Sequence, residues 1–226
     1  MTMPTQANIP VLAAAQSIYA CGCMLLPSSS VQLLLPKLLP NNEISFGDIV
    51  HFKKEKFCTL VESGFALPKI SKFLTSPYQS IRVLAALFRI GRLYQSKNNK
   101  ASVPILLRGS LGAICTYMNY HQGASRIFES EFTCSLGIKI LETDTNFLIY
   151  HQKNIGWSVK IGGEKDSSSA QLIFQNTEIA HQAALGDLDS WIALTKGDVQ
   201  LSGRIPMLDK FGYVARIAQS EVPSPK

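Results

Sequence analysis

The feature that most limits how this chain can fold is a change in the spacing of its apolar residues after residue 135. Three segments before that point have apolar residues at the period of amphipathic helices, namely residues 76–95, 103–120 and 124–132. Four later segments alternate or are rich in β-branched and aromatic residues, namely 136–141, 146–151, 155–161 and 170–175. A run of helices followed by a run of strands favours an α+β fold.

The stretch GDVQLSGRIPMLDKFG, residues 197–212, reads as a short strand that turns directly into an apolar helix. Pro206 suits the first turn of that helix, because proline lacks the amide proton that is unpaired there in any case. Two short helices are expected between this stretch and the preceding strand, at residues 176–185 and 187–196. The predicted order is therefore strands, two short helices, a last strand and a closing helix.

This order, together with several short motifs, resembles the C-terminal half of the sterol carrier protein 2 family of lipid-binding domains. The motifs are LIF (172–174), HQAALG (181–186), WIALTKG (191–197), VQLSG (199–203) and MLDKFG (207–212). The chain departs from the family pattern at Asp198, where a basic residue is expected, and at Pro206. The resemblance is strongest over about fifty residues and does not cover the first hundred. It implies a five-stranded, mostly antiparallel sheet covered by helices with an apolar tunnel, preceded by a helical N-terminal region.

The resemblance also implies that the domain holds a sterol-like, isoprenoid or acyl lipid and catalyses nothing. Burial of a lipid tail is worth roughly 0.8 kcal/mol per CH₂, so few polar contacts are needed. The expected cavity residues from strands are Trp157, Val159, Leu172, Phe174, Val199 and Leu201. Those from helices are Ile192, Met207, Leu208, Phe211 and Val214. For each of them, ordinary core packing is the alternative interpretation.

Two regions are expected along the chain. Residues 1–75 form a helical or irregular N-terminal region that associates with a membrane, and residues 76–226 form the lipid-binding domain, best supported over 124–219. The first 36 residues carry no charged side chain. A signal sequence or membrane span remains an alternative for them, but the apolar run is interrupted by Gln16 and Ser17 and lacks a preceding basic segment. A helix packed on the protein or lying on a membrane surface is favoured.

The basic residues gather in the middle of the chain. The net charge is +6, and residues 76–135 hold seven basic and two acidic side chains. Arg82, Arg89 and Arg92 fall within an arc of about 80° on one helix. This basic face predicts contact with an anionic membrane surface. The solvated face of an ordinary surface helix is the alternative.

No catalytic or metal-binding pattern accompanies these features. The five cysteines are an odd number in apolar surroundings, which favours free thiols, and the pair Cys21 and Cys23 has no second pair to complete a zinc site. The histidines form no zinc motif, and no nucleophile elbow, phosphate-binding loop or nucleic-acid reader is present. We therefore expect a non-enzymatic protein with no cofactor, no metal and no nucleic-acid partner, located in the cytoplasm at the periphery of a membrane.

Two alternatives to a simple carrier remain. The protein is either an accessory factor that presents a lipid intermediate, such as a quinone precursor, to biosynthetic enzymes, or a module whose cavity is filled by its own side chains. Stable enzyme partners would identify the first, and failure to bind any lipid would identify the second.

Overall fold

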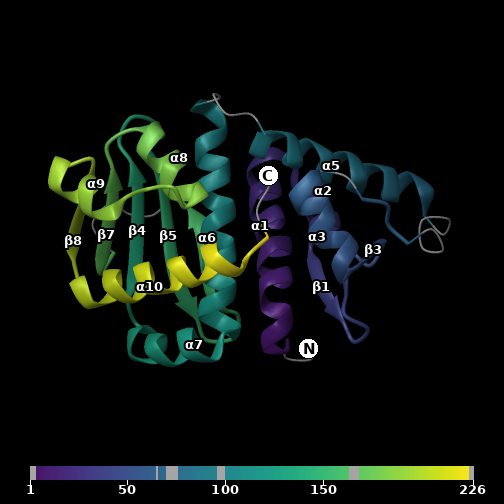
Figure 1. Cartoon of the computed structure of the whole chain (residues 1–226), viewed down its shortest axis with the longest axis horizontal. Helices are drawn as coiled ribbons and strands as arrows, with labels where there is room; N and C mark the ends of the chain where they lie inside the picture. The colour runs from purple at the N-terminus through teal and green to yellow at the C-terminus, as the bar shows by residue number, and fades with distance from the viewer. Residues whose placement is uncertain (1–3, 65, 70–75, 96–99, 163–167, 224–226) are drawn as a thin grey trace.

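The computed structural model describes residues 4–64, 66–69, 76–95, 100–162 and 168–223. The parts of the expected N-terminal region at 1–3, 65 and 70–75 lie outside them. Two sheets and two clusters of buried apolar residues organise the described chain. Figure 1 shows the larger sheet and its helices on one side of α1 (Ile9–Leu25) and the smaller sheet on the other.

The larger sheet confirms the expected five strands. They are β4 (Ser135–Ile140), β5 (Thr145–Gln152), β6 (Gly156–Ile161), β7 (Ala170–Phe174) and β8 (Val199–Gly203). Their order is β6-β5-β4-β7-β8, and every neighbouring pair is antiparallel except β4 with β7. The alternating residues Leu136, Ile138 and Ile140 are all buried, as one core-facing side of a strand requires.

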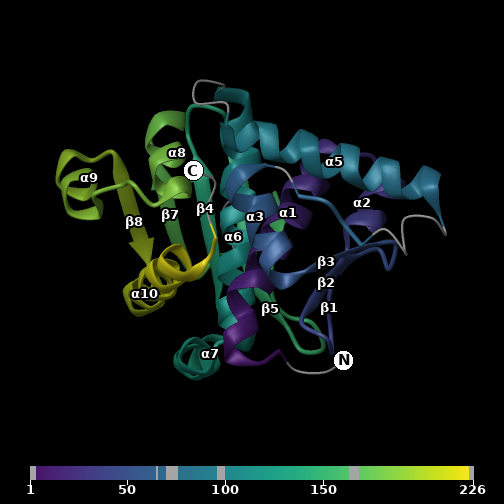
Figure 2. The ribbon, with the colours of Figure 1, turned by 45° about the vertical axis from the view of Figure 1, so that its right-hand side comes forward.

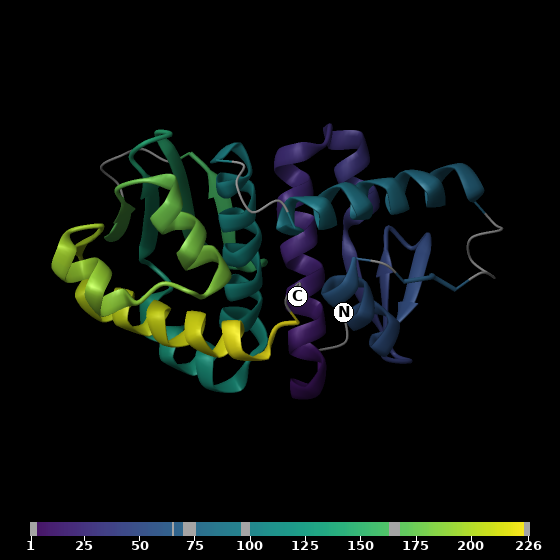
Figure 3. The ribbon, with the colours of Figure 1, turned by 45° about the horizontal axis from the view of Figure 1, so that its top comes forward.

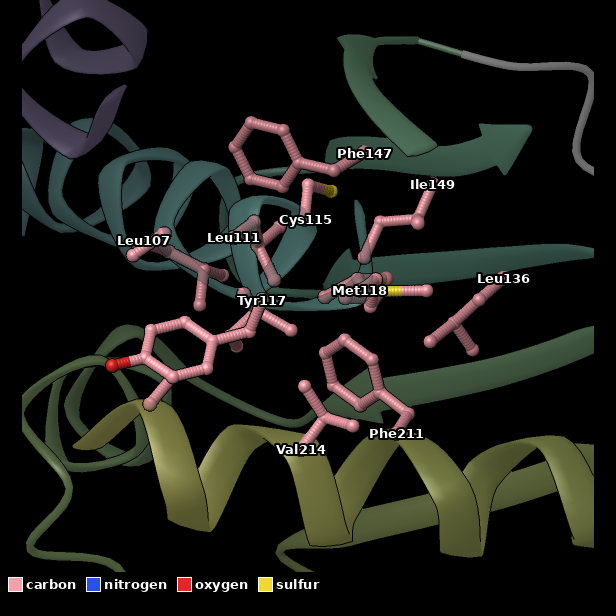
Figure 4. Packing of buried hydrophobic residues seen from close by; sticks show 14 of the residues in the cluster. Leu107, Leu111, Cys115, Tyr117, Met118, Leu136, Phe147, Ile149, Phe211 and Val214 are labelled. Atoms are coloured by element: carbon pink, nitrogen blue, oxygen red, sulfur yellow. The ribbon is translucent and has the colours of Figure 1, made fainter. Parts of the chain in front are cut away.

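Helices cover one face of this sheet. They are α6 (Val103–Tyr120), α7 (Gln122–Phe128), α8 (Thr177–Leu185), α9 (Ser190–Lys196) and α10 (Ile205–Glu221). Short 3-10 turns precede α6 at Lys100–Ser102 and follow α7 at Glu129–Glu131. Figure 4 shows Met118 of α6 packed between Leu136 of the sheet and Phe211 of α10. The α+β class with helices over a five-stranded sheet is therefore confirmed.

The N-terminal region contains a sheet that the sequence interpretation missed. Its helices are α1, α2 (Ser28–Val31) and α3 (Lys54–Ser63), with 3-10 turns at Gln6–Asn8 and Gln32–Leu34. Its strands are β1 (Pro36–Leu39), β2 (Glu43–Phe46) and β3 (Val50–Lys53), paired antiparallel in the order β1-β2-β3. Each strand has only four residues. The residues of β2 and β3 alternate between polar and apolar, but over a stretch too short to identify a strand, and all four residues of β2 are buried. The expected helical or irregular region therefore also contains a three-stranded sheet.

Helix α1 joins the two parts of the molecule by packing along α6, and Figure 3 shows it between α6 and the N-terminal strands. The backbones approach closely at Gly112, where an added Cβ would lie 2.9 Å from the Cβ of Ala20. The helical segments Gln6–Leu25 and Lys100–Tyr120 are long and apolar enough to cross a membrane, but 61% and 72% of their apolar windows are buried inside the protein. Burial in the core accounts for that composition.

Helix α5 (Pro77–Gln95) packs on the N-terminal core, although the sequence placed it in the lipid-binding domain. The division at residue 75 stays a prediction. The buried apolar residues of α5 are Val83, Ala86, Leu87 and Ile90. Ile81 and Phe88 of the same helix are each 57% exposed. Helix α5 carries more apolar residues than one face can bury. The spacing of its apolar residues alone therefore did not show which face packs on the core.

Candidate functional site

A pocket of about 650 Å³ lies on the helix-covered side of the larger sheet. Its walls come from β4, β7 and β8, from α6 and α10, and from the segment containing α8 and α9. It continues past α6 to α1, α3 and α5 of the N-terminal region. Its volume lies within the range of about 300–1,000 Å³ that is usual for small-molecule sites.

Six of the eleven expected cavity residues line this pocket. They are Leu172, Phe174, Val199, Leu201, Leu208 and Phe211. Leu172 pairs directly with Leu201 across β7 and β8, and Phe174 pairs with Val199. Residues paired in register point to the same side of a sheet, so these four side chains form one apolar surface. Their contact with a lipid stays a prediction.

The other five expected residues do not line the pocket that the described residues form. Trp157 is buried against Phe128, with ring centroids 5.2 Å apart, and Val159 packs beside the same core. Met207 and Val214 are fully buried on the core side of α10. Ile192 is 51% exposed on α9. For these five, core packing or solvent exposure replaces the expected wall position.

Helix α10 has separate core and pocket sides because successive residues advance by about 100° around a helix. Met207 and Val214 occupy the core side, whereas Ile205, Leu208 and Gly212 occupy the pocket side. Phe211 belongs to both, since it lines the pocket and packs in the core. Of the four residues of α10 that the sequence placed in the cavity wall, Met207 and Val214 lie in the core, and Leu208 and Phe211 line the pocket.

Large apolar side chains surround the pocket where it meets solvent. Trp191 of α9 is 78% exposed, and Leu185, Leu201 and Ile205 are also exposed. Exposed apolar residues gathered around a concave site commonly mark a place where ligands or membranes are contacted. The N-cap of α9 is Asp189, whose carboxylate accepts from the backbone amides of Trp191 and Ile192.

The polar groups in the wall are few. The hydroxyl oxygens of Ser17 and Tyr94 lie 2.9 Å apart in the N-terminal part of the pocket. Burial raises the pKa of Tyr94 well above its ordinary value, so its hydroxyl stays protonated. Ser110 donates to the carbonyl oxygen of Ala184, at 2.9 Å, and ties α6 to α8. Asp209 and Arg216 of α10 are exposed at the pocket edge.

A buried carboxylate holds the first turns of α10 in place. Glu131 has no exposed surface and accepts from Arg204 Nε at 2.7 Å and from Lys210 Nζ at 2.6 Å. Burial alone would raise the pKa of Glu131, but the hydrogen bonds from Lys210 and Arg204 outweigh it and lower the pKa to about 2. The network therefore stabilises the fold most at neutral pH.

Glu131→Gln is expected to lower the free energy of unfolding by about 2–3 kcal/mol at pH 7, because it removes one partner of a buried ion pair. A depressed pKa contributes stability above the ordinary value of 4.5, and that contribution is lost as pH falls toward about 2. The difference between wild type and variant should shrink over this window in urea unfolding at several pH values. A difference that is constant between pH 7 and pH 2 would show that the ion pair is not its source.

The described residues contain no group of three potential metal ligands, and the five cysteines in them are free thiols. His121 caps α7 by accepting from the amide of Ala124, at 3.3 Å. His151 stacks on Phe132 with ring centroids 4.1 Å apart. These contacts give both histidines structural roles.

A scan against protein-family models gives no match, and neither does a search of curated proteins. Several solved structures overlap with the chain, and three of them carry sterol carrier protein 2 in their descriptions. One is described as a UbiJ-SCP2 ubiquinone synthesis protein, with 13% identity, 51% of this chain and 96% of that chain covered, and a TM-score of 0.38. The second is sterol carrier protein domain 2 of Helicoverpa armigera, with 16% identity, coverages of 53% and 92%, and a TM-score of 0.40. The third is apo sterol carrier protein 2 of Yarrowia lipolytica, with 13% identity, coverages of 48% and 92%, and a TM-score of 0.34.

These solved structures are sterol carrier protein 2 domains, the family that residues 171–218 resemble. At such identities and TM-scores, the overlaps carry no information about a ligand or an activity.

Proposed function

We propose that this protein binds and carries a sterol-like, isoprenoid or acyl lipid without catalysing a reaction. The observation that supports the proposal most strongly is the apolar pocket of about 650 Å³, which has aliphatic and aromatic side chains on both its sheet and its helix walls. A lipid tail that leaves water for such a pocket gains roughly 0.8 kcal/mol per buried CH₂. A long tail therefore supplies useful affinity without a charged anchor.

The test is mass spectrometry of an organic extract of the purified protein, followed by titration with a fluorescent fatty acid and a fluorescent sterol. We expect close to one lipid per chain, or saturable uptake by protein that was purified empty. A folded protein that carries no lipid and takes up neither probe would contradict the proposal and favour a cavity filled by its own side chains.

The exposed apolar mouth also supports the accessory-factor version of this function. A protein that hands its lipid to enzymes must let the lipid leave through a surface that another apolar surface can cover. Trp191 and Ile205 lie at such a position. Pull-down of the lipid-loaded protein would distinguish the two versions, since stable enzyme partners are expected only for an accessory factor.

We also propose that α5 brings the protein to an anionic membrane, which implies a cytoplasmic location at the membrane periphery. The outer side of α5 exposes Arg82, Arg89 and Arg92 next to the apolar residues Tyr78 and Phe88. The opposite side of the same helix lines the pocket through Leu87 and Tyr94. Arginines interspersed with aromatic residues suit the interface between lipid headgroups and acyl chains.

Replacing Arg82, Arg89 and Arg92 together by glutamine should weaken binding to phosphatidylserine-containing vesicles by up to about a hundred-fold, since each basic residue near such a surface is worth about 1 kcal/mol. Vesicle co-sedimentation at low salt measures the effect. The matched control removes three exposed charges elsewhere, at Arg126, Lys153 and Lys160. Equal losses in both variants would show that only net charge matters and would exclude α5 as the contact surface.

A further inference from the structure

The pocket has a second wall that belongs to the N-terminal region. This wall is formed by Ser17 of α1, Leu60 and Val61 of α3, and Leu87 and Tyr94 of α5. Figure 2 shows α8, α9 and α10 on one side of α6 and α5 on the other, with α3 overlapping α6 and α1 in this view. One continuous pocket therefore borders both parts of the molecule, and a ligand that fills it contacts both.

Two glycines inside helices leave space in this pocket from opposite sides. Gly91 lies in α5 and Gly212 in α10, and both line the pocket. A Cβ added at either position would meet no atom within 4 Å. Neither residue has a positive φ, so the backbone does not require glycine. Glycine within a helix costs about 1 kcal/mol relative to alanine. The molecule thus gives up stability at two positions where a side chain would enter the pocket.

The polar feature of the N-terminal wall is the hydrogen-bonded pair of Ser17 and Tyr94. Ser17 is only 9% exposed, and its hydroxyl oxygen lies 2.9 Å from that of Tyr94. The bond between two hydroxyls uses one of their two protons. The Tyr94 oxygen also lies 3.6 Å from the sulfur of Cys21, within hydrogen-bond distance, but sulfur is a weak acceptor. A ligand oxygen would be a better acceptor for the second proton.

The charge of this wall limits which oxygen group it accepts. The pocket residues that α1, α3 and α5 contribute include no lysine, arginine or histidine. Arg108 of α6 acts electrostatically on Cys21 but does not line the pocket. A carboxylate or phosphate placed there would therefore lose its hydration without direct contact with a cation, which is costly. An alcohol or carbonyl oxygen needs only a hydrogen bond, and the hydroxyl pair can supply it.

We propose that the N-terminal region forms half of the lipid site and that the Ser17–Tyr94 pair binds the uncharged oxygen group of a long-chain lipid, whose tail extends over the sheet. This inference rests on the proposed lipid-binding function. It selects neutral alcohols and ketones or quinones within the broader lipid class, and it gives α1, α3 and α5 a direct part in binding.

The test measures dissociation constants for 1-hexadecanol, hexadecane and decane by displacement of a fluorescent lipid. Tyr94→Phe should weaken 1-hexadecanol about 3–10-fold, the usual net value of one hydrogen bond, and leave hexadecane unchanged. Gly91→Leu should weaken 1-hexadecanol at least about ten-fold by displacing two or more methylene groups. It should leave decane unchanged, because the space over the sheet stays open.

Thermal unfolding checks that both variants are folded, and leucine at position 91 should not lower the melting temperature because it favours helix. Unchanged 1-hexadecanol binding in Tyr94→Phe would overturn the role of the hydroxyl pair. Equal weakening of decane and 1-hexadecanol in Gly91→Leu would overturn the two-part site. If either result is found but the variant still binds decane, the proposed lipid-binding function stands and only the role of the hydroxyl pair or the two-part site is overturned. If the wild-type protein binds none of the three probes, both the lipid-binding function and the two-part site are overturned.

Discussion

Gly203→Ala is expected to lower the free energy of unfolding by about 2–5 kcal/mol, through strain in the left-handed backbone region and overpacking. Gly203 ends β8 with φ at +80°. An added Cβ would lie 2.5 Å from the carbonyl oxygen of Ser169 and 3.0 Å from the Cα of Ala170. Both obstacles are backbone atoms, so no side-chain rotation can relieve the collision. The start of β7 must move away from β8, and α10 must move with it.

Gly197→Ala is the matched control for this prediction. Gly197 also has a positive φ, at +77°, but a Cβ there meets nothing within 4 Å. Its replacement should cost only the backbone strain of about 1–2 kcal/mol. Urea unfolding of both variants measures the two values. Equal losses at the two positions would show that the close approach of β7 to Gly203 does not contribute.

The part of the fold around these glycines was predictable from sequence because its signals are local. Alternation identified β4, where Leu136, Ile138 and Ile140 are buried as expected. The turn glycines and Pro206 marked the passage from β8 to α10. Leu172 and Leu201, both expected to face inward, pair directly across β7 and β8. Such patterns depend on residues a few positions apart, which a single sequence displays directly.

The N-terminal half lacked such signals. Its strands alternate polar and apolar residues over only four positions, which is too short to identify a strand, and β2 is buried on both sides, including Glu43 and Ser45. The wall that α1, α3 and α5 add to the pocket depends on segments up to about two hundred residues apart meeting around one space, since Ser17 and Phe211 both line it. No periodicity encodes which distant segments meet. The resemblance that identified the sheet side of the pocket did not extend to these residues.

Core and cavity are also hard to separate by composition, as α10 illustrates. Both require apolar residues, so Met207 and Val214 were expected in the wall although they lie in the core. Gly212 indicates the pocket side of α10 better than these apolar residues do. It lies inside a helix where no close packing requires a glycine, so its missing side chain leaves the pocket open. That inference requires knowing what surrounds the glycine, which only the folded chain shows.

Gly212→Leu is expected to raise stability and to reduce lipid binding in the same protein. Leucine gains about 0.8 kcal/mol over glycine in helix propensity, which corresponds to roughly 2–4 °C in melting temperature for a chain of this size. Its side chain enters the pocket from α10 and displaces several methylene groups of a tail, so affinity should fall about 10–100-fold. Thermal unfolding without ligand and titration with a fluorescent fatty acid measure the two effects.

Gly212→Ala separates the two contributions, because alanine restores the helix propensity but adds only one methyl group to the pocket. It should match or exceed the stability of the leucine variant relative to wild type and keep most of the affinity. A general disturbance of the fold would lower both the melting temperature and the lipid affinity. A Gly212→Leu protein that is more stable but binds lipid more weakly, beside a Gly212→Ala protein that keeps its affinity, therefore indicates that the leucine side chain occupies the lipid site. A stabilised Gly212→Leu protein with wild-type affinity would mean that the lipid lies elsewhere than in this pocket.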